Sequence, residues 1–337
     1  MLRFNGEITK TNSLERLNRF DNIIEKGQTE MKVEESTRRL AFIKYLYNMA
    51  VEQSMKSEPT CVSSVLTFHD SIELFLELAS EHLDIGKSGV DFMEYWKLLK
   101  QKLKGDGLTQ KESIRQLNTA RVGLKHSGIF PSKLAIEGFR ASVTNFFEEN
   151  TPTVFDVKFA DISLIELVRC QAAKDSLKEA EENLKGKRIE DSLDNAALAF
   201  AQLVDDYESR KTDEFGRSPF FFGESMFPLD GSFIAGDFGG FIEKVKESLT
   251  VLRDAVKILS LGLDYRRYAR FRLLTPIVLR VIGGKYVIQR IQRGSRGNPT
   301  TEDVRFCVDF VIESAIILQE FDFEVEHGKH PTLGGLK

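Results

Sequence analysis

The sequence predicts a mainly α-helical protein, and three observations lead to this expectation. Apolar residues recur at spacings of three and four along most of the 337-residue chain, which is the periodicity of amphipathic helices. Proline is scarce, and Pro59, Pro131 and Pro152 flank the periodic segments. With 42% hydrophobic and 29% charged residues, the chain has a globular balance that excludes wholesale disorder. Its length fits about two domains.

A five-helix bundle is expected over residues 31–152, after an N-terminal extension over 1–30. Its helices are predicted over 34–56, 61–83, 91–103, 109–126 and 132–149. Thr109 and Glu112 form the pattern of a capping box at the start of the fourth helix. Gly128 ends that helix, and Pro152 follows the end of the fifth.

A helical hairpin is expected over residues 153–212. The short stretch 154–160 alternates and is predicted to be extended, and helices follow over 163–184 and 189–210. Small residues lie where the two backbones would approach closely, namely Ala180, Ala196, Ala197 and Ala199. A Phe/Gly-rich loop over 213–240 follows, and its Phe cluster either packs at a domain junction or forms an exposed partner patch.

A basic, mostly helical C-terminal domain is expected over residues 241–325, before a tail over 326–337. Helices are predicted over 241–261 and 301–321, the second capped by Thr300 or Thr301. Between them, two apolar segments over 277–282 and 285–291 flank Gly283-Gly284. This pattern predicts a small β-hairpin, and a helix broken at the two glycines is the alternative.

Charge is distributed unevenly along the chain. The segment 253–296 holds eleven Lys or Arg against two Asp, a net charge of +9, so the remainder carries −13 within a total of −4. A basic segment in an acidic chain indicates an anionic partner for one region.

Several classes of protein and site are not expected from the sequence. The three cysteines are far apart and form no CxxC pair, which argues against a zinc or thioredoxin-type site and fits a reducing cytoplasm. The start of the sequence lacks a signal-peptide core, and no apolar run is long enough to cross a membrane. Gly-rich phosphate loops, GxSxG and HExxH are absent, so we expect neither a cofactor nor a metal.

The fourth helix carries the strongest candidate site. Ile114, Leu117, Ala120 and Leu124 form its buried stripe, and Arg121 lies at the edge of this stripe, where a guanidinium needs an anion. His126 lies about 140° around the helix from Arg121, so one straight helix does not bring both to one point. A second copy of the helix, lying across the first, would bring an arginine and a histidine to one site.

The alternatives at this site are structural. Arg121 would pair with Asp70 or Glu73 of the neighbouring helix, and His126 would cap carbonyls at its helix end. His69 lies near the same edge as Glu73, and we favour a structural role for it over one in lining the cleft.

The segment Leu117-Asn118-x-x-Arg121-x-x-x-Lys125-His126-x-Gly128-x-x-Pro131 resembles the HEPN superfamily of helical ribonucleases. Its Arg121-x4-His126 spacing matches the family signature, and the longer frame looks like HEPN proteins of prokaryotic defence and toxin systems. The resemblance covers about residues 30–210. One departure is Val122, because the family usually has Asn, Asp or His there, and Asn118 is one turn away as a substitute.

The resemblance implies metal-independent RNA cleavage in a homodimer or higher homo-oligomer. The ribose 2′-hydroxyl attacks the adjacent phosphorus, His126 moves protons, and Arg121 holds the phosphate. Asn118, Lys125, Glu73 and Asp70 are the expected supporting residues. The implied setting is antiviral defence or a toxin system, with tRNA or mRNA as substrate and a regulatory protein as a further partner.

The basic segment has its own functional interpretation. Its arginines alternate with Tyr265, Tyr268 and Phe271, as in proteins that grip single strands by phosphate neutralisation and stacking. The expected RNA-binding residues are Arg266, Arg267, Arg270, Arg272, Arg290, Arg293 and Arg296, whereas Arg280, between apolar residues, is expected to be structural. The alternatives are a helix face paired with the acidic remainder of the chain and a surface for an acidic protein.

Two further hypotheses for the whole chain stand beside the nuclease. One is a HEPN-like bundle without catalysis that binds RNA or a partner protein, which Val122 and the acidic remainder favour. The other is a helical interaction scaffold in which the motif is accidental.

Overall fold

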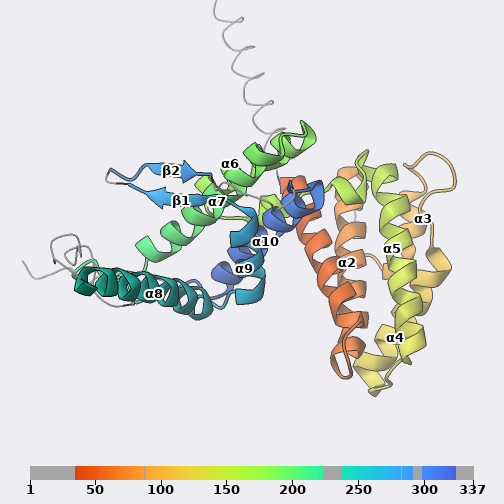
Figure 1. Cartoon of the computed structure of the whole chain (residues 1–337). Helices are drawn as coiled ribbons and strands as arrows, with labels where there is room; N and C mark the ends of the chain where they lie inside the picture. Colours follow the sequence, from red (N-terminus) through yellow and green to blue (C-terminus); the bar gives the residue numbers. More distant parts are fainter. Residues whose placement is uncertain (1–34, 87–88, 223–236, 282, 291–297, 324–337) are drawn as a thin grey trace, which may run out of the picture. The chain divides into compact units, whose positions relative to one another are not determined.

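The computed structural model describes residues 35–86, 89–222, 237–281, 283–290 and 298–323 (Figure 1). The mainly α-helical fold is confirmed, because the strands among these residues form only one antiparallel pair. The chain divides into two units, and the division falls between Glu166 and Leu167. The expected segments 1–30 and 326–337 lie outside the described residues, as does 223–236 of the Phe/Gly-rich loop.

The first unit is the expected helical bundle. Its first helix spans 35–54, and α2 spans Thr60–His82. The short 3-10 helix η1 (Phe92–Glu94) and α3 (Tyr95–Leu99) occupy the segment predicted as one helix over 91–103. The helices α4 (Lys111–Ser127) and α5 (Lys133–Phe155) complete the bundle, in which α5 packs along α2 (Figure 1).

Aromatic side chains fill the core of this bundle. Phe75 of α2 meets Phe146 of α5 edge-on, with ring centroids 5.3 Å apart, and both rings are fully buried. Phe147 stacks on Phe159 at 4.6 Å, so the segment after α5 also packs onto the bundle. Burial of such rings is the main stabilising term of a helical core.

The capping box expected at Thr109 and Glu112 is wrong. The helix α4 begins at Lys111, and its N-cap residue Gln110 has a left-handed backbone with φ of 58° and makes no side-chain cap. Thr109 is instead held by buried Asn150 of α5, which accepts a hydrogen bond from the Thr109 backbone N at 2.9 Å. The Thr109 carbonyl accepts from Trp96 Nε1 at 3.1 Å. Tertiary hydrogen bonds therefore replace the local cap.

The expected end of the fifth helix before Pro152 and the extended segment over 154–160 are also wrong. The helix α5 continues through Pro152 to Phe155, and the 3-10 helix η2 (Phe159–Asp161) follows. Phe155 packs on Phe75 and His82, with centroid distances of 5.4 Å and 5.0 Å. This packing favours one more helical turn despite the hydrogen bond that proline lacks.

The second unit begins with the expected hairpin of helices, α6 (Gln171–Lys185) and α7 (Ile189–Ser209). The predicted start at residue 163 is wrong, because only the 3-10 helix η3 (Leu164–Leu167) precedes α6. Here the chain pairs with Gln319, whose amide oxygen accepts from the Arg169 backbone N at 2.8 Å. The predicted close approach is confirmed at the four small residues, which are buried: Ala180, Ala196, Ala197 and Ala199.

The remaining elements are α8 (Asp237–Ser260), α9 (Tyr265–Leu274), β1 (Ile277–Arg280), β2 (Tyr286–Gln289) and α10 (Thr301–Glu320). The helix α8 begins four residues earlier than expected. Both α9 and α10 pack around Phe200 of α7, whose ring lies 5.2 Å from Phe271 and 5.4 Å from Phe310. Thr300 caps α10 in a capping box with Asp303.

The β-hairpin expected at Gly283-Gly284 is confirmed. Its strands pair in antiparallel register, with Ile277 opposite Gln289 and Arg280 opposite Tyr286. The two glycines have φ of 92° and 78°, a left-handed conformation that residues with a Cβ rarely adopt. The alternative of a helix broken at these glycines is therefore wrong.

The hydrogen bonds of Asn150 give a first prediction. Asn150→Ala removes the hydrogen bond that fully buried Asn150 accepts from the Thr109 N–H, so we expect the free energy of unfolding of the bundle to fall by about 1 kcal/mol. Urea unfolding followed by Trp96 fluorescence measures this, because Trp96 is the only tryptophan and reports on this unit alone. Thr153→Ala, at an exposed site on α5, is the matched control. Equal stability of the two variants would contradict the role assigned to Asn150.

Candidate functional site

Arg121 lies in the second half of α4, where the helix leaves the core. Ile114 and Leu117 in the first half are fully buried, whereas Arg121 is half-buried. Its guanidinium forms neither an ion pair nor a hydrogen bond with any residue that the structure describes. The alternative in which Asp70 or Glu73 neutralises Arg121 is therefore wrong, because both carboxylates lie beside His69.

His126 is exposed near the C-terminal end of α4. The carbonyls at this end are satisfied by the backbone, because Gly128 N donates to Leu124 O at 3.2 Å and Ile129 N donates to Gly123 O at 3.1 Å. These two bonds form a Schellman motif, and Gly128 has the left-handed φ of 64° that it needs. The alternative in which the His126 side chain caps the helix thus has no support in the described hydrogen bonds.

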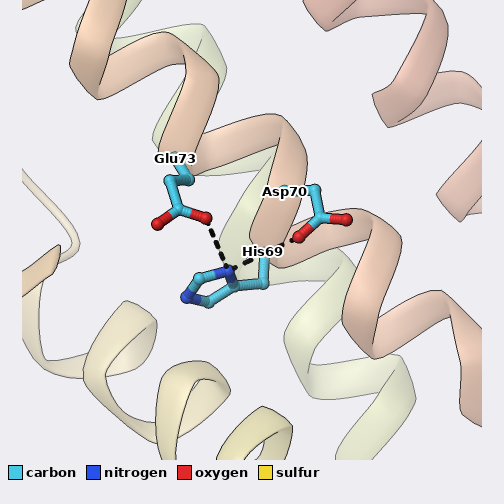
Figure 2. A group of neighbouring side chains, drawn as sticks. All are labelled: His69, Asp70 and Glu73. Carbon is cyan, nitrogen blue, oxygen red and sulfur yellow. Dashed lines mark ion pairs between the residues drawn. The ribbon is translucent and has the colours of Figure 1, made fainter. Parts of the chain in front are cut away.

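The supporting residues divide between two surfaces. Lys125 and Val122 are exposed beside Arg121 and His126. Asn118 turns instead toward α2, where its Oδ1 lies 3.1 Å from Nε2 of buried His69. Asp70 and Glu73 flank the same histidine, with carboxylate oxygens 3.8 Å and 3.7 Å from its Nδ1 (Figure 2). Three of the expected supporting residues, Asn118, Asp70 and Glu73, therefore surround His69 and not Arg121.

Large apolar side chains are exposed around the end of α4. Val122 is 44% exposed, and Ile129, Phe130 and Leu134 at the turn and at the start of α5 are 64%, 58% and 78% exposed. Single exposed apolar residues are ordinary on a protein surface, but several within one turn region are typical of an interaction site. No periodicity or motif in the sequence indicates this surface.

The arginines of α9 are partly engaged within the second unit. Arg267 forms an ion pair with Glu313, and Arg270 pairs with Asp303 at 3.2 Å. Arg270 also lies over the Phe306 ring at 4.1 Å. By contrast, Arg266 and Arg272 are exposed and form no ion pair with a described residue.

The aromatic residues between these arginines have mostly structural positions. Phe271 is buried in the core of the second unit, and Tyr268 packs against Phe200 at 5.7 Å. Tyr265 is 39% exposed. Of the three aromatic residues that the sequence analysis offered for base stacking, Tyr265 therefore presents the most open ring.

The β-hairpin is attached to α7 through charge. Arg290 contacts Asp194 at 2.6 Å and Asp191 at 2.7 Å, and hydrogen bonds to these carboxylates raise its pKa above the ordinary value. Arg280 lies 3.7 Å from Asp205, in keeping with the structural role expected for it. The remaining residues of the expected RNA-binding set, Arg293 and Arg296, lie outside the described residues.

Tyr286 of β2 shares Asp205 with Arg280. Its hydroxyl donates to Asp205 Oδ2 at 2.9 Å. Burial, together with this hydrogen bond, raises the pKa of Tyr286 to about 12. The acidic face of α7 thus binds the hairpin through one neutral and two cationic side chains.

The second unit also has features that sequence reasoning missed. The helix α8 exposes apolar side chains on much of its length, including Val251, Leu252 and Leu259, each about 60% exposed. A cavity of about 290 Å³ lies between α6, α7 and α10 and is lined by Cys170, Tyr207 and Gln319 among others. Burial raises the pKa of the Cys170 thiol, so this cysteine is not an activated nucleophile.

Comparison with family models, with curated proteins and with solved structures gave no significant match. None of the helices in the described part of the chain has both the length and the apolar character that crossing a bilayer requires.

The environment of Tyr286 gives a second prediction. Tyr286→Phe removes the hydrogen bond to Asp205, so we expect a loss of about 1 kcal/mol of stability at neutral pH. Since the folded pKa is raised from 10 to about 12, this contribution is complete below pH 10 and disappears as the pH rises through 12. Absorbance at 295 nm should yield a wild-type-minus-variant difference that titrates near 12. A difference centred at 10 would contradict the assignment, and Tyr265→Phe is the control.

Proposed function

We propose that this protein is a HEPN-type endoribonuclease that cleaves RNA without a metal, at a site formed by two copies of Arg121 and His126. The observation that carries the proposal is the half-buried residue Arg121, whose guanidinium has no partner among the described residues. A partly desolvated arginine binds an anion strongly and in a defined geometry. An RNA phosphate is the anion that suits this position.

A second subunit supplies what one helix lacks. Arg121 and His126 project from α4 about 140° apart. A phosphate bound by Arg121 is therefore not reached by His126 of the same helix. Exposed apolar side chains follow Arg121 and His126 closely in the chain and favour a self-complementary contact, namely Val122, Ile129, Phe130 and Leu134. Pairing across it covers these side chains and brings two α4 helices together.

The chemistry requires two proton carriers and one electrostatic clamp. One His126 takes the proton of the ribose 2′-hydroxyl as its oxygen bonds to phosphorus. The P–O5′ bond breaks, and the second His126 gives a proton to the leaving oxygen. Arg121 stabilises the charge that grows on the phosphoryl oxygens. The products carry a 2′,3′-cyclic phosphate and a 5′-hydroxyl, and the setting that we propose is prokaryotic antiviral defence or a toxin system, in the cytoplasm.

A second candidate function is RNA binding or partner binding without catalysis. The observation that favours it is Val122, an apolar and 44% exposed residue where HEPN ribonucleases usually have a polar one. In that case Arg121 still binds phosphate or a carboxylate of a regulatory protein. Cleavage assays separate the two functions.

Cleavage chemistry gives a third prediction. With total RNA and tRNA in EDTA, the wild-type protein should produce cyclic-phosphate ends, and His126→Ala should lower the rate by about 100-fold or more with the fold retained. Arg121→Ala should lower it similarly, whereas Arg115→Ala, on the same helix and paired with Glu112, is the matched control. If the wild-type protein cleaves no RNA, the ribonuclease proposal is contradicted and the non-catalytic binding function is favoured.

Mixing subunits tests the composite site. Because each site needs both His126 copies, an equal amount of His126→Ala subunits should reduce wild-type activity to about half through inactive mixed dimers. An unchanged rate after subunit exchange would show that each subunit acts alone.

The basic segment gives a fourth prediction. If α9 delivers RNA, its two unpaired arginines carry the binding, so Arg266→Gln/Arg272→Gln should weaken RNA affinity and lower the salt dependence by about two phosphate contacts. Arg267→Gln/Arg270→Gln is the matched control, because these side chains already pair with Glu313 and Asp303. Binding that ignores ionic strength, or an equal loss in both variants, would contradict this role of α9.

A further inference from the structure

Three potential metal ligands lie close together on α2, one buried and two reaching solvent. Nδ1 of His69 lies 3.7 Å from Glu73 Oε2 and 3.8 Å from Asp70 Oδ1, and one donor atom from each residue falls within 4.8 Å of the others (Figure 2). The His69 side chain is 2% exposed, whereas those of Asp70 and Glu73 are 58% and 42% exposed. The group is therefore closed on the protein side and open to solvent on the other.

The hydrogen bonding of His69 leaves Nδ1 without a partner. Its Nε2 lies 3.1 Å from Oδ1 of Asn118 on α4, and because an amide oxygen only accepts, this contact places a proton on Nε2. Nδ1 is buried and makes no hydrogen bond with a described residue. In the tautomer with the proton on Nε2, the Nδ1 lone pair faces the two carboxylates, and a bound cation would stabilise this arrangement of three electron-rich groups.

The surroundings hold the histidine ring in this orientation. Phe92 of η1 stacks on it, with centroids 4.2 Å apart, and Asn118 fixes the opposite ring edge. A histidine that ligates a metal usually donates its other N–H to a carbonyl or carboxylate oxygen, which sets both tautomer and orientation. The Asn118 amide has this position here.

We propose that His69, Asp70 and Glu73 bind one divalent transition-metal cation of the Zn²⁺ class. Zinc bonds of about 2.0–2.2 Å in tetrahedral geometry bring neighbouring donors to about 3.4 Å from each other. The distances from His69 Nδ1 to the two carboxylates, 3.7 Å and 3.8 Å, are close to this value. The three donors lie within 4.8 Å of one another, so rotation of the exposed Asp70 and Glu73 side chains completes the approach. One imidazole with two carboxylates suits Zn²⁺, whereas Mg²⁺ prefers oxygen ligands alone. Water from the solvent side completes the coordination.

This site is separate from the proposed cleavage chemistry. It contains neither Arg121 nor His126, and its expected effect is to stabilise the contact between α2 and α4 through His69 and Asn118. The test needs no RNA, so its result is independent of the ribonuclease proposal.

Metal binding by the full chain tests the proposal. After removal of metals with EDTA and exchange into buffer, calorimetric titration with Zn²⁺ should give one site per chain. Saturation at about 100 times the Kd should raise the Tm of the bundle, followed by Trp96 fluorescence, by about 5 °C or more. Mg²⁺ at the same concentration should have no such effect.

Isosteric variants identify the ligands. Asp70→Asn/Glu73→Gln keeps the shape of the site and the buried histidine but removes both anionic ligands, so the Zn²⁺ affinity should fall by at least about 100-fold. Glu77→Gln, at an exposed carboxylate on the same helix, is the matched control and should bind like the wild type. Binding of Zn²⁺ by the double variant with wild-type affinity would place the metal elsewhere and overturn the proposal. Absence of Zn²⁺ binding and of a Tm shift in the wild type would overturn it equally.

Discussion

The contact between buried His69 and Asn118 joins the two regions of the bundle that carry its proposed chemistry. An unpaired buried nitrogen costs about 1–3 kcal/mol, so the hydrogen bond at Nε2 matters for a histidine whose side chain is only 2% exposed. Asn118 pairs with Nε2 and, together with buried Ile114 and Leu117, orients α4 in the bundle. This orientation leaves Arg121, one turn after Asn118, at the rim of the bundle. The position of the guanidinium thus depends in part on a histidine of another helix.

The helix α4 has two halves with different environments. Just before its first residue, Thr109 forms hydrogen bonds with Asn150 and Trp96. Its last turns lie outside the core, and backbone hydrogen bonds satisfy the carbonyls at its C-terminal end. A helix held at one end and exposed at the other presents its last two turns to a partner without loss of its own hydrogen bonds. The apolar residues around His126 lie in this exposed part, which is why we associate the proposed cleavage site with subunit pairing.

Basic and acidic residues that are far apart in the sequence form ion pairs within the second unit. Asp191, Asp194 and Asp205 of the acidic helix α7 bind Arg290, Arg280 and Tyr286 of the hairpin, and α10 neutralises Arg267 and Arg270. Exposed ion pairs of this kind contribute little stability each, and the attachment of α9 depends mainly on the buried contacts of Phe271 with Phe200 and Phe310. Because several of its arginines are already paired, the basic segment offers nucleic acid less positive charge than its net charge suggests. In α9, the arginines without an ion pair to a described residue are Arg266 and Arg272.

Local patterns in the sequence determined the helical class and most helix bounds, because hydrophobic periodicity is visible over a few residues. Small side chains likewise predicted the close-packed helical hairpin with its buried alanines. The two adjacent glycines predicted the turn between the strands, because glycine readily adopts positive φ. The sequence also brought Arg121 and His126 to attention through their spacing. Only the tertiary structure decided that Thr109 bonds to Asn150 rather than capping α4, that α5 continues past Pro152, and that Asp70 and Glu73 face His69 instead of Arg121. These outcomes depend on side chains from other helices, whose positions follow from burial in a shared core and not from any local pattern.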